Sequence, residues 1–342
     1  MTKKVRAGII GFGRMGRRHL EAYLKNPQTE IGACCDVNPD ALKFLDAREI
    51  DCNRYTDWRE MLRDESFDVL SVVTNGPTHA EITIEAAKAG IRRIICEKPM
   101  ATSIKDAKRM IDATEESGIR LVINYSRRLS ASYRKLKDSL REGIIGQLCE
   151  IRCVCGGGLL ACNGSHFLDL MYFLFDSEPT SVVGFVDKKG TPNPRGAQYT
   201  DPGAFGLVTF GHRMRGFLDM YEDLGIPPRI EVVGSVGRAI IVESSDTWQI
   251  ESRQGKDRLE PLGRYDLPLK SSPFQVEPLD ATQLTGKIIS EVLGDGPIVC
   301  SRENGLAALE MVMGFHASDQ MANTPVPIPL PSKFEEMTIN FT

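Results

Sequence analysis

Three glycines near the start of the chain have the spacing of a phosphate-binding loop. Gly11, Gly13 and Gly16 follow an apolar run at residues 5–10 and open a predicted helix. In such a loop the first glycine permits a tight turn, the second lets the backbone approach a pyrophosphate, and the third lets the helix pack closely on the strand. The alternative is a tight turn without a ligand. The loop residues expected to contact a dinucleotide are Gly11, Phe12, Gly13, Arg14, Met15 and Gly16.

An acidic residue stands where the second predicted strand, residues 31–36, ends. Asp36 lies twenty residues beyond Gly16, where a carboxylate is placed to accept hydrogen bonds from the adenosine ribose. Its charge would repel a 2′-phosphate, and Val37, Asn38 and Pro39 supply no cation to offset that repulsion. The sequence therefore predicts NAD in preference to NADP. The alternative is that Asp36 caps a helix beginning near Pro39.

A lysine follows the fourth predicted strand, residues 93–96, in the tripeptide Glu97-Lys98-Pro99. Ligands of parallel sheets bind at the carboxyl ends of the strands, so this position is suited to chemistry. Lys98 could hydrogen-bond a substrate hydroxyl, favour its deprotonation and return the proton in the reverse direction. Burial would lower the pKa of Lys98, whereas a nearby Glu97 would raise it. The alternative is an exposed lysine in a turn.

The elements that must position these residues alternate between strand and helix patterns in the first part of the chain. Strands are predicted at residues 5–10, 31–36, 68–74, 93–96 and 120–124. Helices are predicted at residues 14–26, 57–63, 77–89 and 103–117. Such alternation implies parallel strands joined by right-handed crossovers, which make a doubly wound α/β sheet. Residues 1–125 are therefore predicted to form an NAD-binding Rossmann domain.

After residue 125 the pattern changes to short strands punctuated by turn residues. These strands are predicted at residues 148–155, 181–187, 205–210, 215–221, 230–233, 239–243 and 247–251. Helices are predicted at residues 131–142, 166–175, 281–293 and 302–321, and a loop at residues 191–202. The pattern suits an open, mostly antiparallel β-sheet with flanking helices, an α+β arrangement. Residues 126–342 are predicted to form this second domain.

Composition narrows the possible partners. The chain has 342 residues and a net charge of −4 with both signs interspersed, so it lacks the basic stripe of a nucleic-acid binder. The sequence shows no leader pattern and no apolar run long enough to cross a bilayer. We therefore expect a protein that is not exported and has no membrane partner. Nine cysteines at irregular spacings indicate reduced thiols in the cytoplasm, and no metal site is expected.

Motifs spread over nearly the whole chain resemble those of the Gfo/Idh/MocA family, the glucose–fructose oxidoreductase and inositol dehydrogenase group. The motifs are residues 11–19, 74–79, 97–99, 124–128, 164–169 and 232–237. The resemblance implies a nicotinamide-dependent enzyme that acts on a secondary alcohol or ketone of a sugar, cyclitol or related polyol. It also implies a second domain built on an open sheet, whose free face commonly forms the interface of a homodimer or homotetramer.

The resemblance also assigns roles to individual residues. It implies that Lys98 and His166 are catalytic, since a neutral imidazole suits removal of a hydroxyl proton as hydride leaves the carbon. Many relatives have an aspartate four positions before this histidine, where this chain has Cys162. The proton route therefore stays open between Lys98, His166 or both. The residues expected to contact substrate are Lys98, Arg127, Asn163, His166 and Asp169.

Several of these residues could instead have a purely structural role. Asp169 lies one helical turn after His166 and could orient it or serve only the fold. Arg127 and Arg128 could bind substrate or form an interdomain salt bridge, and His166 could be a core or capping histidine. Further residues expected to contact the cofactor are Thr74, Asn75, His79, Glu97 and Lys98.

The prediction is thus an NAD-dependent oxidoreductase that transfers a hydride between the nicotinamide and a polyol-like substrate. One alternative is a substrate that is a nucleotide-linked sugar or sugar acid, which the departure at Cys162 leaves open. Another is a non-catalytic NAD sensor that kept the fold. Retention of both Lys98 and His166 argues against that second alternative.

Overall fold

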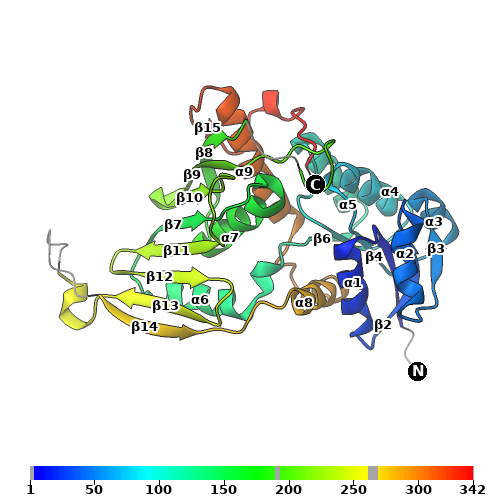
Figure 1. Cartoon of the computed structure of the whole chain (residues 1–342), viewed down its shortest axis with the longest axis horizontal. Helices are drawn as coiled ribbons and strands as arrows, with labels where there is room; N and C mark the ends of the chain where they lie inside the picture. The colour runs from blue at the N-terminus through cyan, green and yellow to red at the C-terminus, as the bar shows by residue number, and fades with distance from the viewer. Residues whose placement is uncertain (1–3, 189–192, 261–268, 342) are drawn as a thin grey trace.

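The computed structural model describes residues 4–188, 193–260 and 269–341. Two β-sheets lie side by side along the long axis of the molecule, each with helices packed on it (Figure 1). The N-terminal residues form the first sheet and its helices, and residues after 125 form most of the second part. The predicted combination of an α/β and an α+β unit is confirmed.

The first sheet has six parallel strands in the order β3-β2-β1-β4-β5-β6, the doubly wound arrangement in which ligands bind at the carboxyl ends of the strands. Its strands are β1 (Val5–Ile10), β2 (Thr29–Cys35), β3 (Asn53–Tyr55), β4 (Val69–Val72), β5 (Arg93–Cys96) and β6 (Arg120–Ile123). Its helices are α1 (Arg14–Leu24), α2 (Pro39–Asp46), α3 (Trp58–Asp64), α4 (His79–Lys88) and α5 (Ile104–Glu116). The predicted Rossmann fold is confirmed.

The second sheet has nine strands in the order β14-β13-β12-β11-β7-β10-β9-β8-β15. Neighbours pair antiparallel except β7 and β10, which are parallel, so the prediction of a mostly antiparallel sheet is confirmed. Its central strands are β7 (Leu148–Val154), β8 (Pro179–Val186), β9 (Ala204–Phe210), β10 (Arg215–Asp219), β11 (Arg229–Gly234), β12 (Gly237–Val242) and β13 (Thr247–Ser252). The edge strands are β14 (Lys270–Gln275) and β15 (Val326–Pro327). The helices of this part are α6 (Ala131–Arg141), α7 (Ser165–Phe175) and α9 (Arg302–Gln320).

One helix from late in the chain completes the first unit. Helix α8 (Ala281–Leu293) packs on α1 and on β5 and β6. Its Ile288, Ile289 and Val292 are buried in the same apolar cluster as Ile9 and Leu20. The first sheet is therefore covered by α1, α2 and α8 on one face, and by α3, α4 and α5 on the other. Spatially, residues 281–293 belong with the nucleotide-binding unit although they lie after residue 125.

Four elements were absent from the sequence expectations: α2, β3, β14 and β15. Helix α2 carries a clear start signal, because Asn38 accepts a hydrogen bond from the amide of Asp40 and Pro39 occupies the first turn. The three strands lie at sheet edges and are short or polar, so they lack an apolar alternation. In the expected loop at 191–202, the first two residues lie outside the described residues and the remainder has no regular strand or helix.

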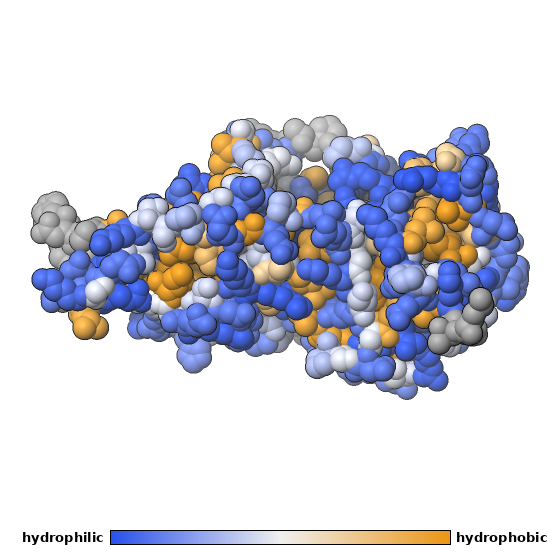
Figure 2. Space-filling model, turned by 90° about the horizontal axis from the view of Figure 1, so that it is seen from below, coloured by the Kyte–Doolittle hydropathy of each residue, from blue (hydrophilic) through white to orange (hydrophobic). Residues whose placement is uncertain are grey.

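Among the described residues no helix is both long and apolar enough to cross a membrane. Seen from below, the surface carries several separate apolar areas among hydrophilic residues (Figure 2). On the second sheet, Phe185 and Phe205 are partly exposed and stack on each other, with ring centroids 4.6 Å apart. This pair gives the sheet an apolar outer surface next to solvent.

Candidate active site

A cavity of about 760 Å³ lies between the glycine loop, the carboxyl ends of β4, β5 and β6, and the start of α7. Ligands of open parallel sheets bind at this place, outside the carboxyl ends of the strands. Residues of both units line it, so the site is shared between them. The predicted site residues that line it are Gly13, Arg14, Met15, Thr74, Asn75, Glu97, Lys98, Arg127, Asn163 and His166.

The glycine loop has the geometry that a bound pyrophosphate requires. Gly11 has a φ of +94°, and a Cβ there would lie 2.5 Å from the main chain of Val73, so a side chain is excluded. A Cβ on Gly16 would lie 2.1 Å from the Gly11 oxygen, whereas one on Gly13 would meet nothing within 4 Å. Gly13 precedes α1 and offers no capping side chain, and the first turn holds no acid. The open helix N-terminus therefore fits the phosphates of NAD.

Asp36, which directly follows β2, hydrogen-bonds the backbone of this loop. Its carboxylate accepts hydrogen bonds from the amide of Phe12 at 2.6 Å and from the amide of Asn38 at 2.9 Å. A carboxylate has about four acceptor sites, so sites remain for the ribose hydroxyls of NAD. The Phe12 side chain itself is buried in the core. Gly11, Phe12, Gly16 and Asp36 lie outside the lining of the main cavity, on the side where the loop meets the sheet.

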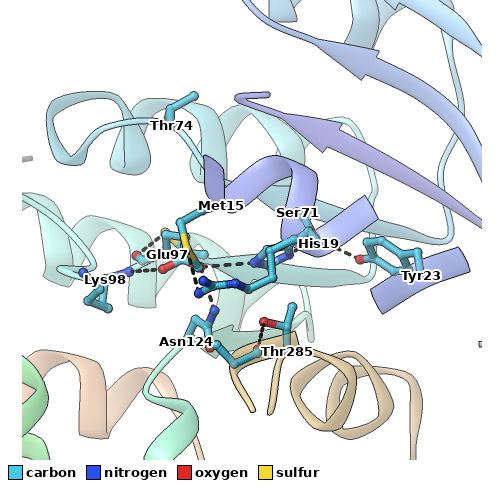
Figure 3. Close-up of polar contacts among 12 residues, drawn as sticks. Met15, His19, Tyr23, Ser71, Thr74, Glu97, Lys98, Asn124 and Thr285 are labelled. Carbon is cyan, nitrogen blue, oxygen red and sulfur yellow. Dashed lines mark hydrogen bonds and ion pairs between the residues drawn. The ribbon is translucent and has the colours of Figure 1, made fainter. Parts of the chain in front are cut away.

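A buried hydrogen-bond network starts at Glu97, beside Lys98, and extends to Tyr23 (Figure 3). Glu97 accepts from Nε2 of His19 at 3.1 Å and from Nδ2 of Asn124 at 2.6 Å. Nδ1 of His19 lies 3.1 Å from the Ser71 hydroxyl, which in turn bonds the hydroxyl of Tyr23 at 2.9 Å. Burial alone would raise the pKa of Glu97, but the hydrogen bonds and nearby positive charges outweigh it and lower that pKa to about 2. Glu97 is therefore a fixed negative charge at the floor of the cavity.

Lys98 reaches across the cavity to the second unit. Its ammonium donates to the main-chain oxygen of Cys162 at 2.8 Å, and the Cys162 sulfur lies 3.7 Å away. The lysine is half-buried, and one of its three ammonium protons is left for a further partner. A group held at this point can bond a hydroxyl oxygen in the cavity and exchange a proton with it. Lys98 thus lies just after β5 and lines the cavity, at the strand end where the sequence placed it.

His166 lies in the first turn of α7 and lines the same cavity. Its ring packs against the edge of Tyr125, with centroids 5.8 Å apart. Burial, together with the positive charges of Arg127 and Lys98, holds the pKa of His166 well below its ordinary value. The imidazole is therefore neutral near pH 7 and able to accept a proton. Its Nδ1 is buried and has no hydrogen-bond partner among the described residues.

Arg127, Arg128 and Asp169 each form an ion pair within the protein. The Arg127 guanidinium lines the cavity and pairs with both oxygens of Glu243 at 2.7 Å. Asp169 is buried and accepts from Nε of Arg128 at 2.9 and 3.0 Å. It lies outside the cavity lining and does not bond His166, so the geometry favours the alternative in which it serves the fold. Burial raises the pKa of Asp169 to about 6, although Arg128 opposes that rise.

His79 also lies outside the cavity lining. Its ring nitrogens are 2.8 Å from the Pro99 oxygen and 3.0 Å from the Thr74 oxygen. Burial lowers the pKa of His79, so the ring is neutral and one nitrogen donates. The ring thereby lies between the segments that follow β4 and β5 and bonds one of them. Asn75, by contrast, faces the cavity and donates to the Tyr199 hydroxyl at 2.7 Å.

The sequence did not single out His19, Asn124 or Asp201 as site residues. Asn124 lines the cavity and directly follows β6, so the strand-end rule that found Lys98 would also have found it. His19 is separated from Glu97 by 78 residues, so no local pattern in the sequence predicts their contact. Asp201 contacts the turn before α7 from a stretch without regular structure. Only the folded chain brings His19 and Asp201 to the site.

Comparison with known families gives two matches that lie in tandem. Residues 5–125 match the family described as "Oxidoreductase family, NAD-binding Rossmann fold". Residues 153–240 match the GFO/IDH/MocA C-terminal domain. The first match spans the glycine loop, Glu97 and Lys98, and the second spans the start of α7 with His166. The two matches thus include the residues that line opposite sides of the cavity.

Individual relatives agree with these matches at modest identity. The chain is 27% identical over 264 residues to the uncharacterized oxidoreductase YrbE of Bacillus subtilis, covering 72% of this chain and 76% of that protein. It is 26% identical over 270 residues to the myo-inositol 2-dehydrogenase of Thermotoga maritima, covering 74% of this chain and 80% of the relative.

Solved structures share the fold over nearly the whole chain. An oxidoreductase domain protein from Kribbella flavida has a TM-score of 0.79 at 19% identity, covering 96% of this chain and 100% of that one. The myo-inositol 2-dehydrogenase of Lactobacillus plantarum has a TM-score of 0.75 at 20% identity, covering 95% and 100%. The family matches also disfavour the alternative of a non-catalytic NAD sensor. The chain belongs to the Gfo/Idh/MocA family and is an NAD-dependent dehydrogenase.

Proposed function

We propose that this enzyme interconverts a secondary alcohol and a ketone on a cyclitol, a sugar or a related polyol. The observation that carries the proposal is that Lys98 and His166 line one cavity with Gly13 of the nucleotide-binding loop. A hydroxyl-bearing carbon held there would lie between a proton-handling pair and the cofactor site. Relatives named as inositol dehydrogenases support the substrate class.

Bound NAD supplies the hydride acceptor for the oxidation. Lys98 donates a hydrogen bond to the substrate hydroxyl oxygen and stabilises negative charge that develops on it. Neutral His166 accepts the hydroxyl proton, because its low pKa keeps it unprotonated near neutral pH. In the reverse direction the protonated imidazole returns that proton to the carbonyl oxygen. Asn163 and Arg127, which also line the cavity, are placed to bond other hydroxyls of the substrate.

A second candidate substrate is a nucleotide-linked sugar or a sugar acid. The cavity is lined by the cations Arg14, Arg18 and Arg195 in addition to Lys98 and Arg127, and Glu97 is the one acid among the described residues of its lining. Positive groups of this kind favour a carboxylate or phosphate. The WlbA dehydrogenase of Bordetella pertussis, solved with NADH and UDP-GlcNAcA, shares the fold at a TM-score of 0.75 and 20% identity.

A substrate panel separates the two candidates. The purified enzyme is mixed with NAD and with myo-inositol, D-glucose, D-glucuronate or a UDP-linked glucose, and reduced nicotinamide is followed by absorbance. Turnover highest with the neutral cyclitol or sugar supports the proposal. Turnover at least tenfold higher in kcat/KM with the acid or the nucleotide sugar selects the second candidate. Absence of turnover with every member, in a protein that binds NAD, contradicts both.

We also propose that the enzyme is a cytoplasmic homo-oligomer that associates through the outer face of the second sheet. The exposed, stacked Phe185 and Phe205 lie on that sheet, and nine free cysteines suit a reducing compartment. Phe205→Asp should then convert a dimer or tetramer into smaller species in analytical ultracentrifugation. A wild-type monomer, or an unchanged assembly in the variant, contradicts this interface.

A further inference from the structure

The turn that leads into α7 is held by a carboxylate from a distant stretch of the chain. Residues Leu160–Gly164 form a single π-helical turn, whose first amides have no partner within the turn itself. The amides of Ala161 and Cys162 donate to the two oxygens of Asp201 at 2.7 and 2.8 Å. The amide of Leu160 donates to the oxygen of Pro202 at 3.0 Å. Asp201 and Pro202 thus satisfy three successive amides.

This turn connects the two residues that handle the proton. The carbonyl oxygen of Cys162 accepts from the Lys98 ammonium at 2.8 Å. The turn runs directly into α7, where His166 is the second residue. Any rotation of the peptide at Cys162 would therefore move the acceptor of Lys98 and the start of the helix that carries His166. Asp201 bonds that same residue through its amide.

We propose that Asp201 is a positioning residue, which fixes the Cys162 turn and thereby sets the placement of Lys98 and His166 for catalysis. The inference rests on the proposed function of those two side chains. Asp201 itself is buried and does not line the cavity, so it acts through the turn. Two charge-assisted hydrogen bonds to one turn are a strong restraint, since such bonds are about twice as strong as neutral ones.

The restraint on the turn depends on the ionisation of Asp201. Burial raises the pKa of Asp201 to about 6, while the bonds from Ala161 and Cys162 and the charges of Lys98 and Arg195 oppose that rise. At pH 8 the carboxylate is ionised and accepts from both amides. A proton taken up near pH 6 turns one oxygen into a hydroxyl, so the turn loses one of its two bonds.

The direct test is Asp201→Asn, assayed in the direction of alcohol oxidation with the best substrate of the panel. The side-chain amide of Asn has one acceptor oxygen, so it can accept from only one of the two backbone amides, Ala161 or Cys162. The turn therefore loses one of its two restraining hydrogen bonds. We expect kcat at pH 8 to fall by about 10²-fold, the effect of a displacement of about 1 Å, with the KM for NAD changed less than about threefold. The wild-type kcat should also fall as the pH drops through about 6, where Asp201 takes up a proton, and Asp201→Asn should lack this step. A kcat within about twofold of the wild type, or the same pH profile in both enzymes, overturns the proposal.

Two further variants separate positioning from loss of the fold. Asp201→Glu keeps a carboxylate, so its kcat should fall less than in Asp201→Asn and should still drop at acid pH. Asp57→Asn is the matched control, because Asp57 also accepts from a backbone amide, that of Arg59 at 2.8 Å, but caps the exposed start of α3. It should leave kcat and the pH profile unchanged. If Asp201→Asn does not fold, a kcat of Asp201→Glu that does not fall at acid pH overturns the proposal.

A measurement without substrate keeps this inference distinct from the proposed function. Lysines are reductively methylated with ¹³C, and the signal of Lys98 is assigned by its loss in Lys98→Met. In the folded protein at pH 8 the Lys98 signal should change its ¹³C chemical shift in Asp201→Asn relative to the wild type, because the carbonyl that accepts from its ammonium is no longer fixed. If the enzyme turns over no substrate but this change is present, the proposed function fails while the coupling of Asp201 to Lys98 stands. An unchanged Lys98 signal overturns the inference.

Discussion

Nε2 of His19 on α1 lies 3.1 Å from the carboxylate of Glu97, the residue that follows β5. This buried contact joins the helix that starts at the nucleotide loop to the residue before Lys98. Asn124, after β6, completes the arrangement by donating to the same carboxylate. The helix that begins at the nucleotide loop and the strand end that precedes Lys98 are thus linked through one buried charge.

Glu97→Gln should destabilise the enzyme in a pH-dependent way. The folded pKa of Glu97 is about 2, below its ordinary value of 4.5, so the ionised group stabilises the fold above about pH 4.5 and that contribution is lost as the pH falls toward 2. At pH 7 the variant should lose on the order of 3 kcal/mol in free energy of unfolding. The measurement is chemical denaturation at a series of pH values.

The difference in unfolding free energy between wild type and Glu97→Gln should shrink steadily below about pH 4.5. Glu85→Gln is the control, because Glu85 forms an exposed pair with Lys88 and should change stability by less than about 1 kcal/mol at every pH. A difference for Glu97→Gln that stays constant from pH 7 to pH 3 would show that the carboxylate is not stabilised by its buried partners.

Asp36→Ala should weaken NAD binding and reduce the preference for NAD over NADP. Removing a carboxylate that bonds the ribose costs about 1.5–3 kcal/mol, or roughly 10–100-fold in Kd, and removes the charge that repels a 2′-phosphate. Calorimetric titration of wild type and variant with both cofactors measures the effect. Asp40→Asn on α2, where Asp40 forms an exposed pair with Lys43, should leave both affinities unchanged. A wild type that binds NADP more tightly than NAD contradicts this account.

Asp169→Asn should be among the most destabilising single changes near the site. It leaves the Arg128 guanidinium buried without its carboxylate partner, and breaking such a buried pair costs about 3–5 kcal/mol. The comparison belongs at pH 8, because the pKa of Asp169 is raised to about 6 by burial and the group is ionised there. Equilibrium denaturation gives the free energy. A loss below about 1 kcal/mol would mean that Arg128 finds other partners.

Much of the fold was predictable because its signals are local. The run at Arg93–Cys96 and the helix Ala281–Leu293 have the predicted bounds, since apolar spacing, a capping Asp280 and flanking glycines define them. The edge strands were missed because half-exposed, polar residues lose the alternation that marks a strand. The packing of α8 on α1 was also beyond the sequence, because it depends on which apolar faces meet in three dimensions.

Site residues that belong to a sequence motif could be predicted. Contacts between residues far apart in the sequence could not. Lys98, His166 and the glycine loop follow from spacing and resemblance, and all three meet at one cavity. The partner of Asp169 could not be read from its place one turn after His166, because the arginine that bonds it stands 41 residues earlier. The bond of Lys98 to a carbonyl oxygen likewise involves a group that every residue has.

The proposed action of Lys98 on the substrate hydroxyl beside bound NAD is tested most directly by Lys98→Met. The variant keeps much of the side-chain length but cannot donate a hydrogen bond or carry a proton. We predict that kcat for alcohol oxidation falls by about 10²–10⁴-fold while the Kd for NAD stays within about threefold. Lys105→Met, which removes an exposed lysine paired with Glu336, should retain full turnover. A Lys98→Met enzyme with near-wild-type kcat would contradict the account.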